Sequence, residues 1–246
     1  MTTLEQQGEL VRIARLLRVD VARLGDLAEL SAATLRAFRD QVTERLFEAD
    51  RSQVAGIAAA TGLLPGGIAA RIAEAVFPAS LAARVAGLLG TDQAADLAGR
   101  LSPAYLAELA PHLDPREAGS LLAGLPTEVV AAAARHLADA GDYLAMADLV
   151  AEMPLPMVAA ALEVIDDVTV LRTALCFTEP ARLAEVVEVL PDVRLEGLLR
   201  AASVEDAWAG LLRALPHLTD EARERLAASA ETLGDGLLIE GLLAAS

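Results

Sequence analysis

The chain alternates between short runs of apolar residues at helical spacing and turns rich in proline, aspartate and serine. Leucines recur every twelve residues in its most regular part, at Leu101, Leu113, Leu125 and Leu137. A turn-forming pair follows each of the first three, as Ser102-Pro103, Asp114-Pro115 and Pro126-Thr127. Apolar residues three and four positions apart between the turns indicate one face of a helix. Each interval therefore predicts one helix of about eight or nine residues, and two intervals predict a helical hairpin.

The same interval extends over residues 64–218 and is interrupted once. Its apolar landmarks are Leu64, Phe77, Leu89, Leu101, Leu113, Leu125 and Leu137, followed by Met153, Ile165, Phe177, Leu190, Ala202 and Leu215. The interval from Leu137 to Met153 is sixteen residues instead of twelve or thirteen. Within this longer interval, Gly141 is suited to ending a helix and Asp142 to capping the next one. Helices this short are unstable alone, so each must bury its apolar face against its neighbours.

Longer and more charged helices flank the repeats. Residues 3–18, 21–30 and 31–48 show helical apolar spacing, and Glu9 and Arg12 are expected on the polar face of the first helix. A helix pair from Thr219 to Ala245 is expected to close the chain. We predict an all-α solenoid, or superhelix, of short antiparallel helices in one continuous domain. It would comprise an N-terminal helical cap (1–63), a repeat array (64–218) and C-terminal capping helices (219–246).

The composition fits a helical chain with an acidic surface. Of the 246 residues, 54% are hydrophobic but only 3% are aromatic, so most apolar side chains are small or aliphatic and suit close helix packing. The net charge of −16 is uneven: residues 1–63 carry eight Arg and nine acidic residues, whereas residues 64–246 carry twelve Arg and twenty-seven acidic residues. Such a surface repels phosphate backbones, and we expect no nucleic-acid partner.

Signals for export and for membrane insertion are weak. A single cysteine, Cys176, allows no internal disulfide and fits a reducing compartment. The first twenty residues lack the apolar core of a signal peptide, so we expect a cytoplasmic location. Residues 52–70 form a nineteen-residue stretch without charge, which approaches the length of a membrane span. The break at Thr61 to Gly67 instead predicts two buried helices there, without membrane insertion.

One part of the repeat resembles a known family. Residues Leu113 to Leu125 read L-D-P-R-E-A-G-S-L-L-A-G-L, and P-T-E follows at Pro126 to Glu128. This pattern resembles the cytoplasmic N-terminal superhelical domain of MgtE-type magnesium transporters, closely over residues 101–137 and more loosely over 64–218. The resemblance implies a right-handed stack of short helices. It also implies an alternative function, that of a Mg²⁺-responsive regulatory module.

Candidate chemistry is sparse. Ser120 lacks the glycine-framed elbow of a serine nucleophile, and Cys176 lies in an apolar segment with no nearby histidine, so we expect no enzyme and no catalytic residues. His112 and His136, which are twenty-four residues apart, suggest either metal ligands or cations favoured at helix C-termini, and we favour the helix ends. Acidic residues at helix starts are explained by capping, with weak Mg²⁺ binding as the alternative. We therefore expect no cofactor and no dedicated metal site.

The interrupted interval is the most informative irregularity. Three of the four methionines fall in this interval or within four residues after it, together with a tyrosine and two prolines. Methionine adapts its shape, so this cluster predicts either an adaptable apolar groove or gap-filling in a disturbed core. The predicted groove residues are Tyr143, Met146, Met153, Met157, Leu171, Leu175 and Phe177. We predict a non-enzymatic helical-repeat scaffold that binds a protein partner there; the alternative is a carrier or sensor of a hydrophobic small molecule, suggested by a mean hydropathy of +0.43.

Overall fold

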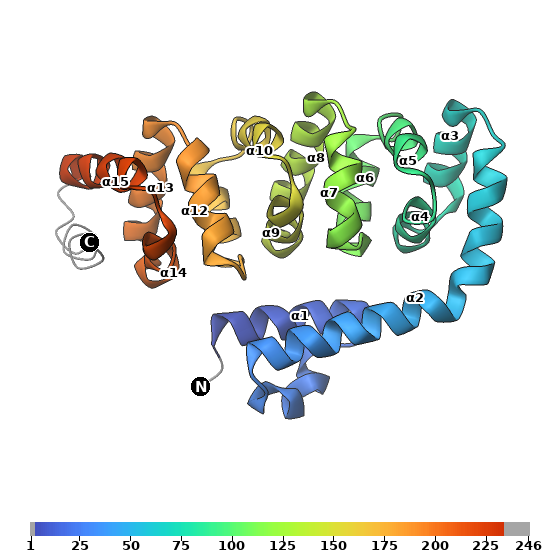
Figure 1. The fold of residues 1–246 in the computed structure, drawn as a ribbon, viewed down its shortest axis with the longest axis horizontal. Helices are drawn as coiled ribbons and strands as arrows, with labels where there is room; N and C mark the ends of the chain where they lie inside the picture. The colour runs from blue at the N-terminus through green and yellow to red at the C-terminus, as the bar shows by residue number, and fades with distance from the viewer. Residues whose placement is uncertain (1–2, 234–246) are drawn as a thin grey trace. The chain divides into compact units, whose positions relative to one another are not determined.

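The computed structural model describes residues 3–233, and every regular element in that range is a helix (Figure 1). The elements are α1 (Leu4–Leu17), the 3₁₀ helix η1 (Val21–Glu29), α2 (Ala32–Gly62), α3 (Gly66–Val76), α4 (Ala79–Ala86), α5 (Thr91–Ala98), α6 (Pro103–Leu109), η2 (Ala110–His112), α7 (Pro115–Ala123), α8 (Thr127–Asp139), α9 (Tyr143–Glu152), α10 (Leu155–Leu162), α11 (Asp167–Leu175), α12 (Pro180–Val189), α13 (Asp192–Val204), α14 (Trp208–Leu212), η3 (Leu215–His217) and α15 (Asp220–Leu233). The all-α prediction is confirmed. No helix in this part of the chain combines the length and the apolar character that a membrane span requires.

Helix starts coincide with turn-forming residues, as predicted for Ser102-Pro103 and Pro126-Thr127. N-cap positions are occupied by Pro65, Pro78, Pro126, Pro154 and Pro191. Proline is tolerated there because the first N–H groups of a helix have no intrahelical acceptor. Ser102 and Asp166 cap through their side chains, Ser102 Oγ accepting from Tyr105 N at 3.3 Å and Asp166 Oδ1 from Thr169 N at 2.8 Å. Helices α4, α5 and α10 have eight residues each, as the twelve-residue interval predicts.

The interrupted interval has the predicted local structure. Helix α8 is extended to thirteen residues and ends before Gly141, whose φ of 67° lies in the left-handed region. Asp142 N donates to Leu137 O at 3.0 Å, which closes the helix C-terminus. Asp142 Oδ1 accepts from Ala145 N at 3.2 Å and begins α9. The assignment of Gly141 as a terminator and Asp142 as a cap is confirmed.

The chain divides into two compact units, Met1–Glu117 and Ala118–Ser246. In the first unit, α2 is a continuous helix of 31 residues, so the predicted helix end near Glu48 is wrong. Neither proline nor glycine interrupts the sequence around Glu48, and its Glu, Ala and Arg residues favour a helix. The uncharged stretch 52–70 thus holds the end of α2 and the start of α3. Only part of it is buried, including Val54 and Ala58, which pack with Val85 of α4.

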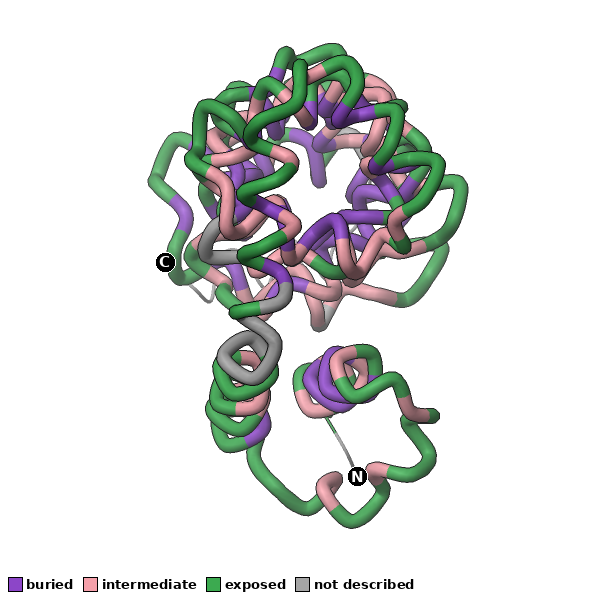
Figure 2. The backbone as a smooth tube through the Cα atoms, turned by 90° about the vertical axis from the view of Figure 1, so that its right-hand side faces the viewer, coloured by how far each residue is buried: buried purple, intermediate pink, exposed green. Residues whose placement is uncertain are grey.

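Within each unit, helices pack mainly against the next helix but one. In the first unit these pairs are α2 with α4, α3 with α5, and α4 with α6; in the second they include α8 with α10, α9 with α11, α10 with α12, α11 with α13, and α13 with α15. Alanine and leucine dominate the buried positions. Buried and exposed positions alternate along the helices, as helical periodicity requires (Figure 2).

Arginine side chains connect more distant helices of the second unit by binding carbonyl groups at helix C-termini. Arg182 of α12 donates to Val150 O at 3.2 Å and to Met153 O, at the end of α9, and Arg194 of α13 donates to Ile165 O at 2.8 Å, just after α10. Arg213, just after α14, donates to Ala174 O of α11 at 3.1 Å. Arg225 of α15 donates to Glu188 O at 3.1 Å and to Leu190 O, at the end of α12. The last carbonyls of a helix lack intrahelical donors and carry partial negative charge. Each guanidinium therefore donates to carbonyl groups at the C-terminus of the α-helix that lies three α-helices earlier in the chain.

A tyrosine makes the corresponding connection in the first unit. The hydroxyl of Tyr105 in α6 lies 3.0 Å from Ala73 O and 2.8 Å from Phe77 O, at the end of α3. Glu74 of α3 accepts a hydrogen bond from the backbone N of Ser102, the N-cap of α6. The C-terminus of α3 and the N-terminus of α6 are thus held together by hydrogen bonds in both directions.

The predicted division into a cap, an array and C-terminal capping helices stays a prediction. Helix α15 forms the first member of the expected closing pair. The apolar segment 236–246 lies outside the described residues.

Candidate binding surface

The structure places most of the predicted groove residues in the interior of the second unit. Five of the seven are buried, namely Met146, Met153, Met157, Leu171 and Phe177. Thr173 Oγ1 lies 3.8 Å from the Met146 sulfur, also in the interior. Tyr143 and Leu175 are partly exposed. The methionines therefore occupy core positions beside the lengthened interval, and the partner groove stays a prediction.

The exposed part of this region is a polar contact built from three helices. Arg172 of α11 lies over the Tyr143 ring of α9, with its Cζ 5.7 Å from the ring centroid, and its Nη1 donates to the Tyr143 hydroxyl at 3.3 Å. Arg172 Nη2 donates to Glu205 Oε1 at 3.0 Å, just after α13. These bonds raise the pKa of Arg172, the Tyr143 bond being the largest cause and Glu205 the next. The cluster links α9, α11 and α13 at their surface through polar groups.

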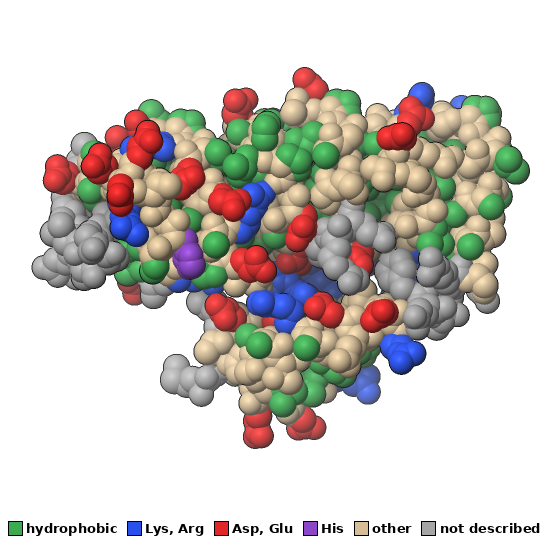
Figure 3. Space-filling view, viewed as in Figure 1, with side chains coloured by type: hydrophobic (Ala, Val, Ile, Leu, Met, Phe, Trp, Pro, Cys, Tyr) green, Lys and Arg blue, Asp and Glu red, His purple; other side chains and the backbone are tan. Residues whose placement is uncertain are grey.

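Among the described residues, the largest group of exposed apolar side chains close together in sequence lies instead in the first unit, at the α2–α3 turn and along α3. We call it the α3 stripe; its members are Leu63, Leu64, Ile68, Ile72 and Val76. Their exposed fractions are 87%, 40%, 51%, 38% and 67%. Hydrophobic side chains are visible at the surface of the right-hand end of Figure 3, where Figure 1 places α3. Contiguous exposed apolar side chains mark interaction sites more often than isolated ones do.

The spacing along α3 explains why the stripe is continuous. Ile68, Ile72 and Val76 are four residues apart and lie along one side of the helix. The neighbouring side carries Ala69, Ala70 and Ala73, all buried; Ala70 and Ala73 pack with Leu101 and Tyr105 in one core cluster. The apolar arc of α3 is therefore wider than the surface that its own unit covers.

The packing order explains why the isoleucine side is uncovered. Helices of this unit pair with the next helix but one, so α3 pairs with α5, whereas α1 pairs with α2 and η1. In the described chain no earlier helix pairs with α3 as α5 does. The α3 stripe is thus the open end of a row of helices, and a helix is the element whose shape matches it.

The stripe is nearly uncharged in a strongly acidic protein. The only charged residues of α3 are Arg71 and Glu74, and the preceding residues from 52 onward carry none. Figure 3 shows acidic side chains scattered over the visible face elsewhere. An ion pair lies near the start of α3, where Arg100 donates to Asp96 at 2.8 and 3.0 Å. Their mutual hydrogen bonds lower the pKa of Asp96 and raise that of Arg100.

Histidines and acidic residues form no metal centre in the part of the chain that the structure describes. His112 and His136 each occupy the last turn of a helix, which confirms their predicted helix-end positions, and His217 also lies in such a turn. Among the described residues no three His, Cys, Asp or Glu side chains are grouped so that they could hold a metal ion. Cys176 is partly buried directly after α11.

Sequence reasoning missed the α3 stripe although its signal was present. The uncharged stretch was interpreted as buried because apolar residues are usually covered. Two adjacent apolar stripes on α3, one of alanines and one of branched side chains, indicate that the helix can bury more surface than one neighbour supplies.

Comparisons with models of known protein families, with curated protein sequences and with solved structures find no match to this chain. The resemblance to the MgtE superhelical domain therefore stays a prediction.

Proposed function

We propose that this chain is a non-enzymatic helical-repeat protein, a right-handed α-solenoid of antiparallel hairpins, that binds a partner protein through the α3 stripe. The next-but-one packing and the recurring arginine contacts to helices three positions back support the repeat architecture. The observation that carries the binding function is the exposed row Ile68, Ile72 and Val76 at the open end of a helix row.

The proposed occupant is an amphipathic α-helix of a different protein. An apolar row at four-residue spacing accepts the apolar face of another helix, as in helix-in-groove recognition. Because α3 carries one Arg and one Glu, the partner face next to it is expected to be apolar and nearly neutral. A second copy of this chain is disfavoured, since two chains of net charge −16 repel each other.

Site-specific photo-crosslinking tests this proposal. A photoreactive phenylalanine analogue replaces Ile68 in the full chain, produced in its native cells, and the crosslinked peptide is identified by mass spectrometry. The expected result is one dominant peptide that is helical and amphipathic. Adding Ile72→Asp to the same protein is expected to remove the crosslink, because a carboxylate in the buried contact is left without a partner.

The matched control is the same analogue at Val193 of α13, another exposed branched apolar residue, which lies outside the stripe. Crosslinks from Ile68 that match those from Val193, or that join two copies of this chain, would overturn the proposed occupant. Circular dichroism of the Ile72→Asp protein establishes that its helices remain folded, which is expected because Ile72 is 38% exposed.

A further inference from the structure

Arg71 is the charged residue of α3 that borders the α3 stripe. It lies three residues after Ile68 and directly before Ile72, and its side chain is exposed. Its guanidinium group makes no hydrogen bond and no ion pair within the part of the chain that the structure describes. Glu74 lies three residues further along, a spacing at which opposite charges can pair on a helix. Glu74 instead accepts the hydrogen bond from Ser102 N, so Arg71 is left without a contacting acid.

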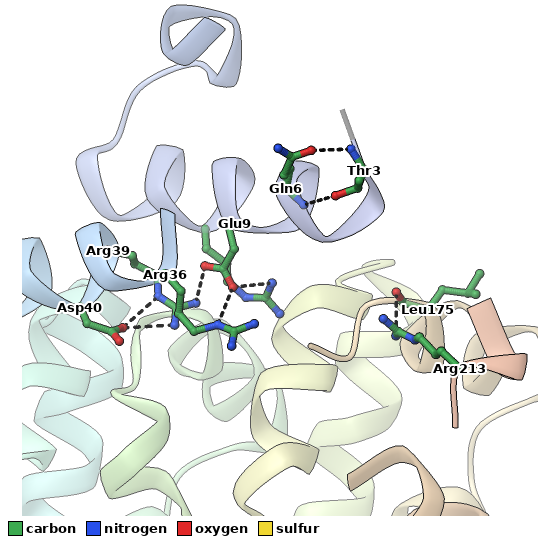
Figure 4. Close-up of polar contacts among 9 residues, drawn as sticks. Thr3, Gln6, Glu9, Arg36, Arg39, Asp40, Leu175 and Arg213 are labelled. Atoms are coloured by element: carbon green, nitrogen blue, oxygen red, sulfur yellow. Dashed lines mark hydrogen bonds and ion pairs between the residues drawn. The ribbon is translucent and has the colours of Figure 1, made fainter. Parts of the chain in front are cut away.

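The contact between α1 and α2 shows how this unit accommodates charges that a neighbouring helix covers. The Glu9 carboxylate of α1 lies 3.0 Å from Arg39 Nη1 and 3.5 Å from Arg36 Nε of α2 (Figure 4). Glu9 has 0% of its side chain exposed and lies 3.7 Å from Arg12 Nη1, so the expectation that both residues lie on a solvated polar face of α1 is wrong. Covered charges meet opposite charges here, because burial of an unpaired charge is costly. The same requirement applies to Arg71 when a helix covers the stripe.

The surroundings of Arg71 allow a helix on the stripe to reach it. Gly67 and Ala75 lie four residues before and after Arg71, on the same side of α3, and both are exposed. No atom lies within 4 Å of the position that a Cβ would take at Gly67. Small residues at a contact allow two helix axes to come closer together. A side chain beside the apolar face of the bound helix therefore lies within reach of the guanidinium group.

We propose that the helix that binds the α3 stripe carries a carboxylate, from glutamate or aspartate, at the edge of its apolar face, and that this carboxylate pairs with Arg71. The inference rests on the proposed function, because Arg71 requires an acidic partner only where a helix covers Ile68 and Ile72. The apolar face itself stays uncharged. An anionic membrane surface would also present acidic groups to Arg71, but it repels a chain of net charge −16, which favours a protein helix.

A displayed library of designed amphipathic helices, selected for binding to the full chain, tests the pairing. Each member has an aliphatic face, and the positions at the two edges of that face are randomised equally among glutamate, glutamine and lysine. Compensating charges on the opposite side give all members the same net charge, so long-range repulsion by the acidic protein acts equally on them. We expect glutamate to be enriched about tenfold over lysine at an edge of the face, because like charges beside Arg71 disfavour binding.

Selection against the Arg71→Glu protein is expected to reverse this preference, so that lysine is enriched over glutamate. Arg23→Glu is the matched control, because Arg23 of η1 is also exposed, lies outside the stripe and has no side-chain hydrogen bond or ion pair among the described residues. It changes the net charge by the same amount and is expected to leave the enrichment of glutamate unaltered. Circular dichroism of both variants verifies that their helices remain folded.

The outcomes separate this inference from the proposed function. Enriched helices that fail to bind the Ile72→Asp protein but show no preference for glutamate over lysine, or the same preference with Arg71→Glu, would overturn the acidic edge and leave the stripe as a binding surface. If no helix is enriched, or if the enriched helices bind the Ile72→Asp protein equally well, both proposals fail. Binding of the full chain to phosphatidylglycerol vesicles that Arg71→Glu abolishes would assign Arg71 to a lipid surface and overturn the pairing.

Discussion

Tyr105→Phe isolates the hydrogen bonds that connect α6 to the end of α3. The substitution keeps the buried ring, which packs with the alanines of α3, and removes only the hydroxyl. Ala73 O retains its bond from Phe77 N at 3.0 Å, whereas Phe77 O loses the only hydrogen bond that it accepts among the described residues. A buried carbonyl left without a donor costs about 1–3 kcal/mol; because Phe77 O is only part-buried, we expect the free energy of unfolding to fall by about 1 kcal/mol.

Urea titration followed by far-UV circular dichroism measures the change, and Trp208 fluorescence adds a second observable. Trp208 is the sole tryptophan and lies in the second unit, so its fluorescence follows the unfolding of that unit. A fluorescence midpoint that stays constant while the dichroism midpoint falls indicates an effect on the first unit alone. Tyr143→Phe is the control, because its partly exposed hydroxyl can be replaced by water; a change within about 0.5 kcal/mol is expected. If Tyr105→Phe leaves the dichroism midpoint unchanged, the connecting role of the hydroxyl is refuted.

The same tyrosine predicts a response to alkaline pH. Burial raises the pKa of Tyr105, and the charges of Glu108 and Glu74 raise it further. A group whose pKa is raised on folding contributes stability that is complete below its unfolded pKa, about 10, and decreases as pH rises above that value. The wild-type protein should therefore lose stability above about pH 10 faster than Tyr105→Phe, so that the difference between them narrows.

Three further changes test individual helix ends, each by urea unfolding of the full chain. Asp166→Ala should lower the free energy of unfolding by about 0.5–2 kcal/mol at pH 7, because the N-cap of α11 is lost. Hydrogen bonds from Thr169, the backbone N–H first, lower the pKa of Asp166. The difference in stability between wild type and variant should therefore disappear as pH falls below about 4. Gly141→Ala should destabilise the protein by about 1 kcal/mol, because the φ of 67° at Gly141 disfavours a side chain. Gly56→Ala should instead stabilise it by about 0.5–1 kcal/mol, because Gly56 lies in the exposed middle of α2 and no atom is near the added methyl group. Equal effects of the two substitutions would contradict the role of Gly141 as a helix terminator. Arg182→Ala should lower the free energy of unfolding by about 1–3 kcal/mol, because the carbonyls at the end of α9 lose their donor. Arg200→Ala, on the exposed side of α13, is the control and should change it by no more than about 0.5 kcal/mol.

Local patterns carried most of the helix predictions. The turn-forming pairs Ser102-Pro103 and Pro126-Thr127 predicted helix starts because the backbone chemistry of the first turn tolerates proline in any tertiary context. The Gly141 terminator followed from the same kind of local rule. The continuity of α2 through Glu48 was missed because charged residues were interpreted as a boundary, although they are good helix formers.

The candidate sites could not be predicted in the same way, because they depend on which surfaces meet. A methionine cluster such as Met153 and Met157 is compatible with a groove or with a core, and only packing distinguishes the two. The burial of Glu9 depends on Arg36 and Arg39, which lie about thirty residues away on another helix. Periodicity within α1 carries no information about those partners.

The arginine contacts connect the fold of the second unit to its charge. Residues 118–246 contain eight arginines and twenty-one acidic residues, and Arg182, Arg194, Arg213 and Arg225 bind helix-end carbonyls. These four guanidinium groups bind backbone dipoles, which carry no net charge. Three of them also pair with a carboxylate, Arg182 with Glu185, Arg194 with Asp167 and Arg225 with Asp192. Arg182 reaches Val150 O and Met153 O at once through separate nitrogens, a geometry that the planar guanidinium provides. One guanidinium can thus serve a helix end and a carboxylate at once, so the acidic excess of this unit follows from its composition, twenty-one acidic residues against eight arginines, and not from how the helix ends are satisfied.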